Sequence, residues 1–274
     1  MVTLPSIAIL GTGSMGGAIL SGLLAPSVTV DGGIRVTNRS VAKAQALESD
    51  SVTSYALETT PDGNAQAIAG AKVVLLGVKP SMIADLLRDI AGSLDADTIL
   101  VSVAAGITTE AMEALVPNVV VRAMPNTPAV VGLAVTGIAA GSRATSEHMD
   151  LARAVFETVG EVLEIPESKI DALGTISGSG PAYVFFLIEE LTRTAIDLGF
   201  SADEAAIMVN GTFRGATELL ASDDTAPAEL RRRVTSPGGT TERAIAELQA
   251  ADLKATFDRA TGAALARSRE IAAG

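Results

Sequence analysis

The chain contains no cysteine and no tryptophan, and aromatic residues make up only 3% of its 274 residues. Without cysteine there is no disulfide framework, no thiolate metal site and no cysteine nucleophile, and nothing argues for an oxidising compartment, so we expect a cytoplasmic location. With so few aromatic side chains, the core must consist mainly of aliphatic residues from the 48% apolar fraction. This composition is typical of helices packed on strands. The length slightly exceeds what one compact core usually carries, so we predict an α/β protein of two domains.

Positive charge is scarce as well. The 20 lysines and arginines are outnumbered by 32 aspartates and glutamates, which gives a formal net charge of −12. Nucleic acid and anionic membranes attract proteins with a broad positive surface, so we expect neither as a partner, and any anion must be bound locally. The start, MVTLPSIAIL, lacks the basic region of a signal peptide, and the apolar run Val184–Ile188 stops at two glutamates, so no membrane-spanning segment is predicted.

Histidine occurs once, as His148, in a polar helix start far in the sequence from every candidate loop. We interpret it as a surface residue, which leaves no relay of histidine with aspartate. The motifs of metalloproteases and calcium loops are absent too, and scattered carboxylates do not specify a metal, so no metal site is expected. A site poor in acids is compatible with reduction of a C=N bond, because a protonated imine already carries the positive charge that makes its carbon electrophilic.

Up to about residue 165, short β-branched runs alternate with alanine-rich helical stretches. Most of these runs are continuously apolar, which is the pattern of parallel strands covered on both faces, and they predict a doubly wound sheet of the Rossmann type. The predicted strands are Ile7–Leu10, Ile34–Thr37, Val73–Val78, Thr98–Val103, Val119–Ala123, Val135–Ala139 and Val162–Ile165.

Beyond Ile165 the pattern becomes helical, with glycine or proline at the joints. We place the domain boundary near Pro166, which gives a nucleotide-binding domain over residues 1–165 and an all-α domain over residues 166–274. The predicted helices are Ile170–Thr175, Pro181–Leu198, Ala202–Ala221, Ala228–Val234, Thr240–Leu248 and Leu253 to the C-terminus.

The stretch SIAILGTGSMGGAI places Gly11, Gly13 and Gly16 in the spacing G-x-G-x-x-G, directly after a strand and at the start of a helix. Gly11 permits the tight turn, Gly13 lets a pyrophosphate reach the backbone, and Gly16 allows close packing of helix on strand. Strand, loop, helix and next strand follow one another within about 30 residues, the length of a βαβ unit, so the motif predicts dinucleotide binding.

The end of the second strand indicates which dinucleotide binds. An NAD site places a carboxylate there for the ribose hydroxyl, whereas this chain has Asn38, Arg39 and Ser40. Arg39 offers a planar, permanently charged fork and Ser40 a hydroxyl donor, and both suit the 2′-phosphate of NADP. We therefore predict NADP(H), with NAD(H) tolerated. An exposed arginine on a turn is the alternative interpretation of Arg39.

Three further loops, Leu75–Ser81, Val101–Gly106 and Val121–Ala129, follow later strands. Ligands of such sheets gather outside the carboxyl ends of the strands, so these loops should line the nicotinamide half of the cofactor. Lys79 precedes a proline in a turn, and we interpret it as a solvated lysine and not as a general acid. Asn126 lies between two prolines, where its amide could serve the cofactor or satisfy the local backbone.

The stretch SPGGTTE, Ser236–Glu242, follows three consecutive arginines and has the composition of a second anion site. Ser236 can cap a helix whose first position is Pro237, and the two glycines that follow leave backbone amides open to a ligand. Without a second nucleotide fold around it, the stretch fits a small anion such as a carboxylate; a well-capped helix start is the alternative. We interpret it as the site of a substrate carboxylate.

Several stretches form one larger pattern: GTGSMG near the N-terminus, VKP, MPNTPA, SGSGPAY at Ser177–Tyr183, and LRRRVTSPGGTTERAIAEL. In this order, and over essentially the whole chain, they resemble the pyrroline-5-carboxylate reductases. The SPGGTT segment is the most specific part, since many dehydrogenases share the N-terminal glycine motif. The resemblance implies reduction of 1-pyrroline-5-carboxylate to L-proline by NADPH or NADH, the last step of proline biosynthesis. It also implies a Rossmann domain followed by a helical domain that forms interlaced dimers or larger rings.

The resemblance also implies roles for the residues that match the family's motifs. Thr241 is the catalytic candidate, with its hydroxyl near the ring nitrogen, and Ser236, Gly239, Thr240 and Thr241 would bind the substrate carboxylate. The pattern departs from the family at Thr240, a frequent alanine, and at the arginines 231–233, which are more basic than expected and have a solvated helix face as their simplest role. The implied cofactor-binding residues are Gly11, Thr12, Gly13, Ser14, Met15, Asn38, Arg39, Ser40, Asn64, Val78, Lys79, Pro80, Ala104, Ala105, Gly106, Met124 and Asn126.

The helical stretch Pro181–Leu198 is apolar nearly all round in its first two turns, so it must be buried on more than one side. A small domain hides such a helix poorly by itself. We therefore predict a homodimer or higher homo-oligomer through the C-terminal helices, in which the SPGGTT loop of one chain faces the cofactor of its partner.

Two other functions compete with this one. β-Hydroxyacid dehydrogenases share the NADP domain and a helical partner, but their catalytic lysine belongs on the helix after a glycine-rich turn, and Gly178–Leu187 contains no lysine. A non-enzymatic NADP-sensing protein would explain the first domain and leave SPGGTT without a purpose.

Overall fold

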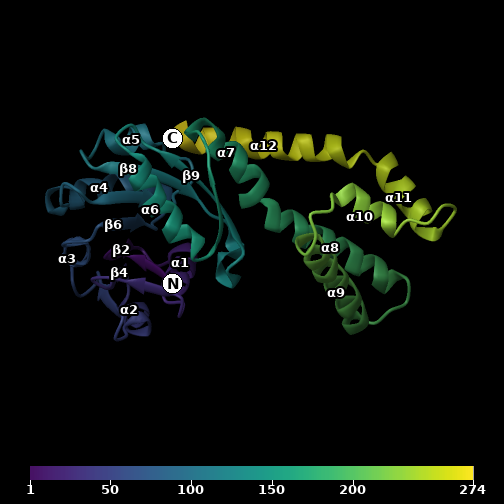
Figure 1. The fold of residues 1–274 in the computed structure, drawn as a ribbon, viewed down its shortest axis with the longest axis horizontal. Coiled ribbons are helices and arrows are strands. Elements are labelled where there is room, and N and C mark those ends of the chain that lie inside the picture. The colour runs from purple at the N-terminus through teal and green to yellow at the C-terminus, as the bar shows by residue number, and fades with distance from the viewer. Residues whose placement is uncertain (274) are drawn as a thin grey trace. The chain divides into compact units, whose positions relative to one another are not determined.

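The computed structural model describes residues 1–273, and Figure 1 shows their arrangement. The chain divides into two compact units. The first comprises Met1–Ser179 together with the C-terminal residues from Ala264, and the second comprises Gly180–Ala263. The division therefore falls a little beyond the predicted boundary near Pro166.

The first unit is built on one eight-stranded sheet with the strand order β10-β9-β8-β7-β6-β2-β4-β5. Neighbouring strands run parallel except for β8 and β9, which are antiparallel. The predicted Rossmann-type fold is confirmed. The strands are β2 (Ile7–Leu10), β4 (Ile34–Asn38), β5 (Val52–Ala56), β6 (Val73–Leu76), β7 (Ile99–Ser102), β8 (Val119–Met124), β9 (Ala134–Ala140) and β10 (Gly160–Glu164).

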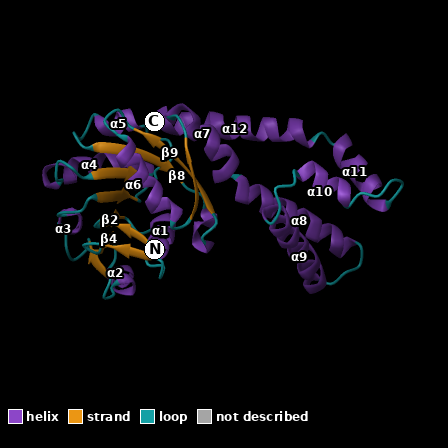
Figure 2. Ribbon diagram, in the orientation of Figure 1, coloured by secondary structure: helices purple, strands orange, loops and turns teal. Residues whose placement is uncertain are grey.

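Helices cover both faces of this sheet (Figure 2). Along β2, Ile7 and Ile9 join the core beneath α1 and α6, whereas Ala8 and Leu10 join the core beneath α3, α4 and α5. Side chains alternate between the two faces of a strand, so a strand covered on both faces must be apolar throughout, as IAIL is. The helices of this unit are α1 (Ser14–Leu23), α2 (Val41–Leu47), α3 (Gly63–Ile68), α4 (Ile83–Ile90), α5 (Thr109–Glu113), α6 (Ser146–Glu157) and α7 (Ile170–Leu173).

The structure corrects the sequence-based description of the strands in three respects. The sequence pattern did not predict β5, because VTSYA, at the edge of the sheet, has two adjacent polar residues and forms no continuous apolar run. It also did not predict that β9 turns back against β8, nor the separate two-stranded sheet of β1 (Val2–Leu4) and β3 (Val28–Val30). The direction of a strand depends on its connection and is not encoded in its apolar pattern.

The second unit is helical, as predicted. Its helices α8 (Gly180–Asp197) and α9 (Ala202–Ala221) pack on each other. Between them the chain turns at Gly199, which has φ +99°, and Ser201 then caps α9 in a reciprocal capping box with Glu204. Three helices follow: α10 (Pro227–Arg233), α11 (Thr240–Ala250) and α12 (Leu253–Ala273), of which α12 belongs to the first unit from Ala264 onward. The predicted extension of the last helix to Gly274 lies outside the described residues. Over residues 1–273, none of the helices is long and apolar enough to cross a membrane.

Candidate active site

The glycine loop after β2 brings three backbone segments into close approach. Gly11 has φ +91°, a conformation that residues with side chains rarely adopt. A Cβ atom added to Gly77, at the end of β6, would lie 2.4 Å from the Gly11 carbonyl oxygen, and one added to Gly16, on α1, would lie 2.6 Å from it. All three positions therefore require glycine. The sequence analysis did not predict that position 77 requires glycine, because Gly77 belongs to no glycine-rich motif.

Gly13 is different, because a Cβ atom added there would meet no protein atom within 4 Å. It is the N-cap of α1 and has no side chain with which to cap the helix. The first amides of a helix lack partners within the helix and carry partial positive charge, so an open space in front of them suits an anion. This geometry fits the pyrophosphate of a dinucleotide.

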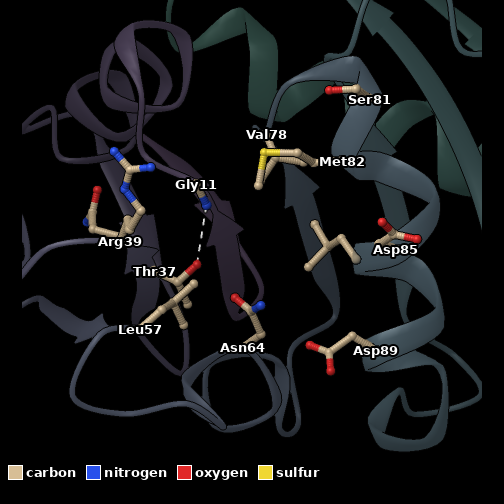
Figure 3. Close-up of a pocket in the computed structure, with 12 residues that line it drawn as sticks. Gly11, Thr37, Arg39, Leu57, Asn64, Val78, Ser81, Met82, Asp85 and Asp89 are labelled. Carbon is tan, nitrogen blue, oxygen red and sulfur yellow. Dashed lines mark hydrogen bonds between the residues drawn. The ribbon is translucent and has the colours of Figure 1, made fainter.

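A cavity of about 440 Å³ adjoins this loop (Figure 3). It lies between the carboxyl end of β4 on one side and α4 on the other. Its walls include five of the predicted cofactor residues and Ser81 of the predicted loop Leu75–Ser81. The lining residues that were not predicted come from β4, from α4 and the turn before it, and from the position directly after β5, the strand that the sequence pattern missed. The lining consists of Gly11, Thr37, Asn38, Arg39, Leu57, Asn64, Val78, Ser81, Met82, Asp85, Leu86 and Asp89.

Asn38 supplies a donor without a partner at the wall of this cavity. Its side chain is buried, and its Oδ1 accepts a hydrogen bond of 2.6 Å from the Thr12 hydroxyl. Within residues 1–273 its Nδ2 is buried and unpaired. A buried donor without a partner costs free energy, and an oxygen of a bound nucleotide would satisfy it. Together with the open space at Gly13, this observation makes the residues present fit an adenosine phosphate.

Arg39 is exposed at the same cavity, where Figure 3 shows its guanidinium group at the rim. None of the ion pairs found in residues 1–273 involves it, so the guanidinium can bind a phosphate from solution. Ser40 is the N-cap of α2, and its hydroxyl makes no capping hydrogen bond, so it too can serve a ligand.

The loops proposed for the nicotinamide end follow β6, β7 and β8, three parallel neighbours whose carboxyl ends meet at one edge of the sheet. Asn126 in the last of them uses both ends of its amide group. Its Nδ2 donates to the Ser177 carbonyl oxygen at 3.0 Å, and its Oδ1 accepts from the Val135 amide at 2.9 Å. Of the two interpretations of Asn126, these contacts favour the one in which it orders the local backbone.

The SPGGTT segment forms a turn followed by a helix. The Gly239 amide donates to the Ser236 carbonyl oxygen at 3.0 Å, and Gly238 has φ +71°. The helix α11 begins at Thr240 with Gly239 as its N-cap, so the predicted cap at Ser236 with Pro237 as first helical residue is wrong. No side chain caps α11, so the amides of its first turn lack partners within the helix.

One amide of this turn is already engaged. The Gly238 amide donates to Oε2 of Glu242 at 2.8 Å, so it is not open to a ligand as the glycine pair suggested. The Ser236 side chain nevertheless lies beside Gly239, since a Cβ atom added to Gly239 would be 3.4 Å from the Ser236 hydroxyl oxygen. The turn therefore brings a hydroxyl to the start of α11, where a small carboxylate can be bound.

Two of the three arginines before this segment are paired on their own helix. Arg232 and Arg233 both contact the Glu229 carboxylate, at 2.7 and 3.3 Å. The hydrogen bond from Arg232 is the main cause that lowers the pKa of Glu229 to about 2. Arg231 instead lines a separate cavity in the helical unit with Leu248 and Leu253. The pairing supports a solvated helix face for Arg232 and Arg233.

A doubly wound sheet with this glycine loop, an orphaned donor and a free arginine at one cavity defines a dinucleotide-dependent oxidoreductase. Comparison with known families agrees: residues 6–106 match the family described as NADP oxidoreductase, coenzyme F420-dependent, and residues 167–271 match pyrroline-5-carboxylate reductase dimerisation. The chain is 40% identical to the pyrroline-5-carboxylate reductase of Corynebacterium melassecola over 97% of its own length and 98% of that relative. The chain belongs to the pyrroline-5-carboxylate reductase family.

Solved structures agree with this assignment. A pyrroline-5-carboxylate reductase from Coxiella burnetii superposes with a TM-score of 0.88 at 34% identity, covering 96% of this chain and 97% of that one. The enzyme from Plasmodium falciparum, solved with NADP bound, gives a TM-score of 0.82 at 25% identity, covering 97% and 98%. The sequence-based identification of the family, the Rossmann-type and helical fold, and the NADP cofactor are confirmed.

The open space at Gly13 generates a prediction. Gly13→Ala should still fold, because its methyl group meets no protein atom, with a slightly lower Tm because alanine is a weaker N-cap than glycine. It should weaken NADPH binding at least roughly tenfold, because the methyl group occupies the space that the pyrophosphate needs. Thermal denaturation and NADPH fluorescence titration measure the two effects.

Gly17→Ala on α1 is the matched control, since an added Cβ there also meets nothing within 4 Å. It should leave NADPH affinity unchanged and raise the Tm slightly, because alanine favours a helix more than glycine does. Unchanged NADPH affinity in Gly13→Ala would show that the cofactor does not approach this amide.

Proposed function

We propose that this chain performs the reaction of its family, the reduction of 1-pyrroline-5-carboxylate to L-proline with NADPH, and with NADH as a second donor. The observation that carries the proposal is the similarity to pyrroline-5-carboxylate reductases over 97% of the chain, across both the nucleotide-binding and the helical part. A sensing protein or a dehydrogenase of another substrate would need only the first part.

The reaction is a hydride transfer, and the bound nicotinamide cofactor supplies the hydride. The hydride adds to the carbon of the protonated C=N bond, and the ring nitrogen keeps its proton as the amine of proline. The amides at the start of α1 would hold the pyrophosphate, Arg39 and Ser40 the 2′-phosphate, and Asn64 the adenosine side. The loops Val78–Pro80, Ala104–Gly106 and Met124–Asn126 would line the nicotinamide end.

At the substrate, Ser236, Gly239 and Thr240 would hold the carboxylate, and the Thr241 hydroxyl would lie near the ring nitrogen. Backbone amides at the start of α11 support this assignment, because such amides attract a negative charge and need no basic side chain to do so. Orientation of the two reacting carbons at about 3 to 3.5 Å is then the main contribution of the protein to the rate.

We further propose that the protein acts as a homodimer or larger homo-oligomer. Large apolar side chains on α8 and α9 remain exposed in the single chain, including Phe185 at 65% and Ile207 at 76%. Exposed apolar surface of this extent marks an interaction site, and the match to a dimerisation domain supports a second copy as its partner. In such a dimer the SPGGTT loop of one chain would face the cofactor of the other. The domain boundary near Pro166 and the cytoplasmic location stay predictions.

The proposed reaction is tested by turnover of purified protein. NADPH should be oxidised on addition of pyrroline-5-carboxylate, with proline as the product, and NADP with hydroxyisobutyrate should give no reaction. Oxidation of hydroxyisobutyrate would favour a β-hydroxyacid dehydrogenase. NADPH binding without turnover of either compound would favour a sensing protein.

Arg39→Ala tests the cofactor preference. Loss of the guanidinium should weaken NADPH binding roughly tenfold to a hundredfold and leave NADH unaffected, because only NADPH carries the 2′-phosphate. The apparent KM of each cofactor measures the effect. Lys43→Ala on α2 is the control, since it removes one nearby positive charge that does not line the cavity. An unchanged ratio of NADPH to NADH would exclude Arg39 as the phosphate ligand.

Thr241→Ala and Ser236→Ala separate chemistry from substrate binding. We expect Thr241→Ala to lower kcat and Ser236→Ala mainly to raise the KM for pyrroline-5-carboxylate, each by roughly tenfold, the value of one hydrogen bond to a charged group. Thr235→Ala is the control, because its hydroxyl already donates to the Arg231 carbonyl oxygen. Equal loss of NADPH affinity in both variants would contradict these roles.

A further inference from the structure

A buried ion cluster lies on β8, before the loop Met124–Asn126 that we propose lines the nicotinamide end. The Arg122 side chain is only 3% exposed, and its Nη2 lies 2.6 Å from Oδ1 of Asp171. Its Nη1 lies 3.6 Å from Oε1 of Glu167. Removing a guanidinium group from water is costly, and apolar residues of similar size often stabilise a fold as well as a buried ion pair does. The cluster therefore calls for a role beyond stability.

The cluster joins three elements that are far apart in the sequence. Glu167 accepts a hydrogen bond of 2.6 Å from the Thr109 amide and another of 2.7 Å from the Thr109 hydroxyl, at the start of α5. Arg122 lies in β8, Glu167 lies in the turn before α7, and Asp171 lies in α7 itself. The guanidinium thus fixes the beginning of the segment 167–178 to the sheet.

The same face of β8 holds the rest of this segment. Side chains two residues apart in a strand point to the same face, so Met124 lies on the side of Arg122. A Cβ atom added to Gly174 or Gly178 would lie 3.1 or 3.3 Å from the Met124 methyl carbon, so the turn between these glycines packs directly on Met124. Asn126, beyond the strand, holds the Ser177 carbonyl oxygen at 3.0 Å.

Residues 174–178 form a π-helical turn, an uncommon conformation that occurs frequently at functional sites. The turn covers Met124 and Asn126, at the carboxyl end of β8, where we place the nicotinamide end of the cofactor. Its position is therefore set at one end by Asn126 and at the other by the ion cluster.

We propose that Arg122, with Glu167 and Asp171, is a positioning cluster for hydride transfer, which rests on the proposed function. The cluster touches neither cofactor nor substrate. It determines where the turn 174–178 lies over the loop 124–126. That turn limits the space in which the nicotinamide ring meets the C=N bond of the substrate. Displacements of about 1 Å in such an arrangement lower rates by up to roughly a hundredfold.

Electrostatics set an order among the variants. Arg122→Met removes the cation that holds both carboxylates at β8 and leaves Glu167 and Asp171 without that partner, so the segment loses this attachment to the strand. Arg122→Lys keeps the charge but cannot reach both carboxylates with one planar fork. Asp171→Asn removes one charge and leaves Arg122 paired with Glu167. The reduction in kcat should therefore be largest in Arg122→Met, smaller in Arg122→Lys and smallest in Asp171→Asn.

The test compares these variants in the full-length protein with Arg153→Met, which breaks the half-exposed ion pair of Arg153 with Glu164 in the same unit. We expect Arg122→Met to lower kcat roughly ten- to a hundredfold, with an NADPH dissociation constant within about twofold of the unmodified protein. The deuterium isotope effect with NADPH labelled at the transferred position should rise, because the hydride step becomes rate-limiting. Arg153→Met should match the unmodified protein in every respect.

Hydrogen exchange supplies a readout that does not depend on turnover. Amides of residues 174–178 should exchange faster in Arg122→Met and Arg122→Lys, and at the unmodified rate in Arg153→Met. Should Arg122→Met fail to fold, Arg122→Lys and Asp171→Asn carry the comparison.

Two results would overturn the proposal: unchanged kcat and isotope effect with only a lower Tm, or unchanged exchange of 174–178. Failure of the proposed function would appear separately, as absence of pyrroline-5-carboxylate turnover in the unmodified protein, and the exchange rates would still decide whether the cluster positions the turn.

Discussion

The close approach of backbone around Gly11 is the constraint on which the nucleotide-binding unit depends. The ends of β2 and β6 and the first turn of α1 converge there. Cβ atoms added to Gly77 and Gly16 would lie only 2.4 and 2.6 Å from the Gly11 carbonyl oxygen. No side chain fits into these distances. Because the backbone segments meet without side chains between them, the amides at the start of α1 face open space, and the cavity beside β4 and α4 begins at Gly11.

Both anion sites that we propose for this chain would use backbone amides at the start of a helix in place of clustered bases. This choice agrees with a formal charge of −12, since a broad positive surface is not available. At the nucleotide site the amides of α1 are supplemented by Arg39 and by the orphaned donor of Asn38. At the SPGGTT turn the protein's own Glu242 engages the Gly238 amide, so the first turn of α11 and the Ser236 hydroxyl are what remain for a substrate.

The strand β8 carries the buried Arg122 and leads to Met124 and Asn126, which we propose lie at the nicotinamide end of the cofactor. Its buried Arg122 anchors the start of the segment 167–178, and Met124 and Asn126 hold its end. Two glycines in the turn allow this contact, because a larger residue at Gly174 or Gly178 would press on the Met124 methyl group. The turn 174–178 thus covers the edge of the sheet where we propose that the nicotinamide binds, and the same strand carries the buried charge of Arg122.

The sequence by itself determined the fold class, the family and most helices, because apolar periodicity, glycine spacing and proline positions act locally along the chain. Short-range motifs predicted Gly11 and Arg39, and the family resemblance predicted Asn64; all three line the cavity. The sequence pattern missed β5, whose edge position leaves its pattern half polar, and it could not give the antiparallel direction of β9. Only the tertiary structure placed α4 at the cavity, started α11 at Thr240, used both ends of the Asn126 amide and joined Arg122 to Glu167 and Asp171. These contacts link residues far apart in sequence, and their partners are chosen by distance in space, which no local pattern records.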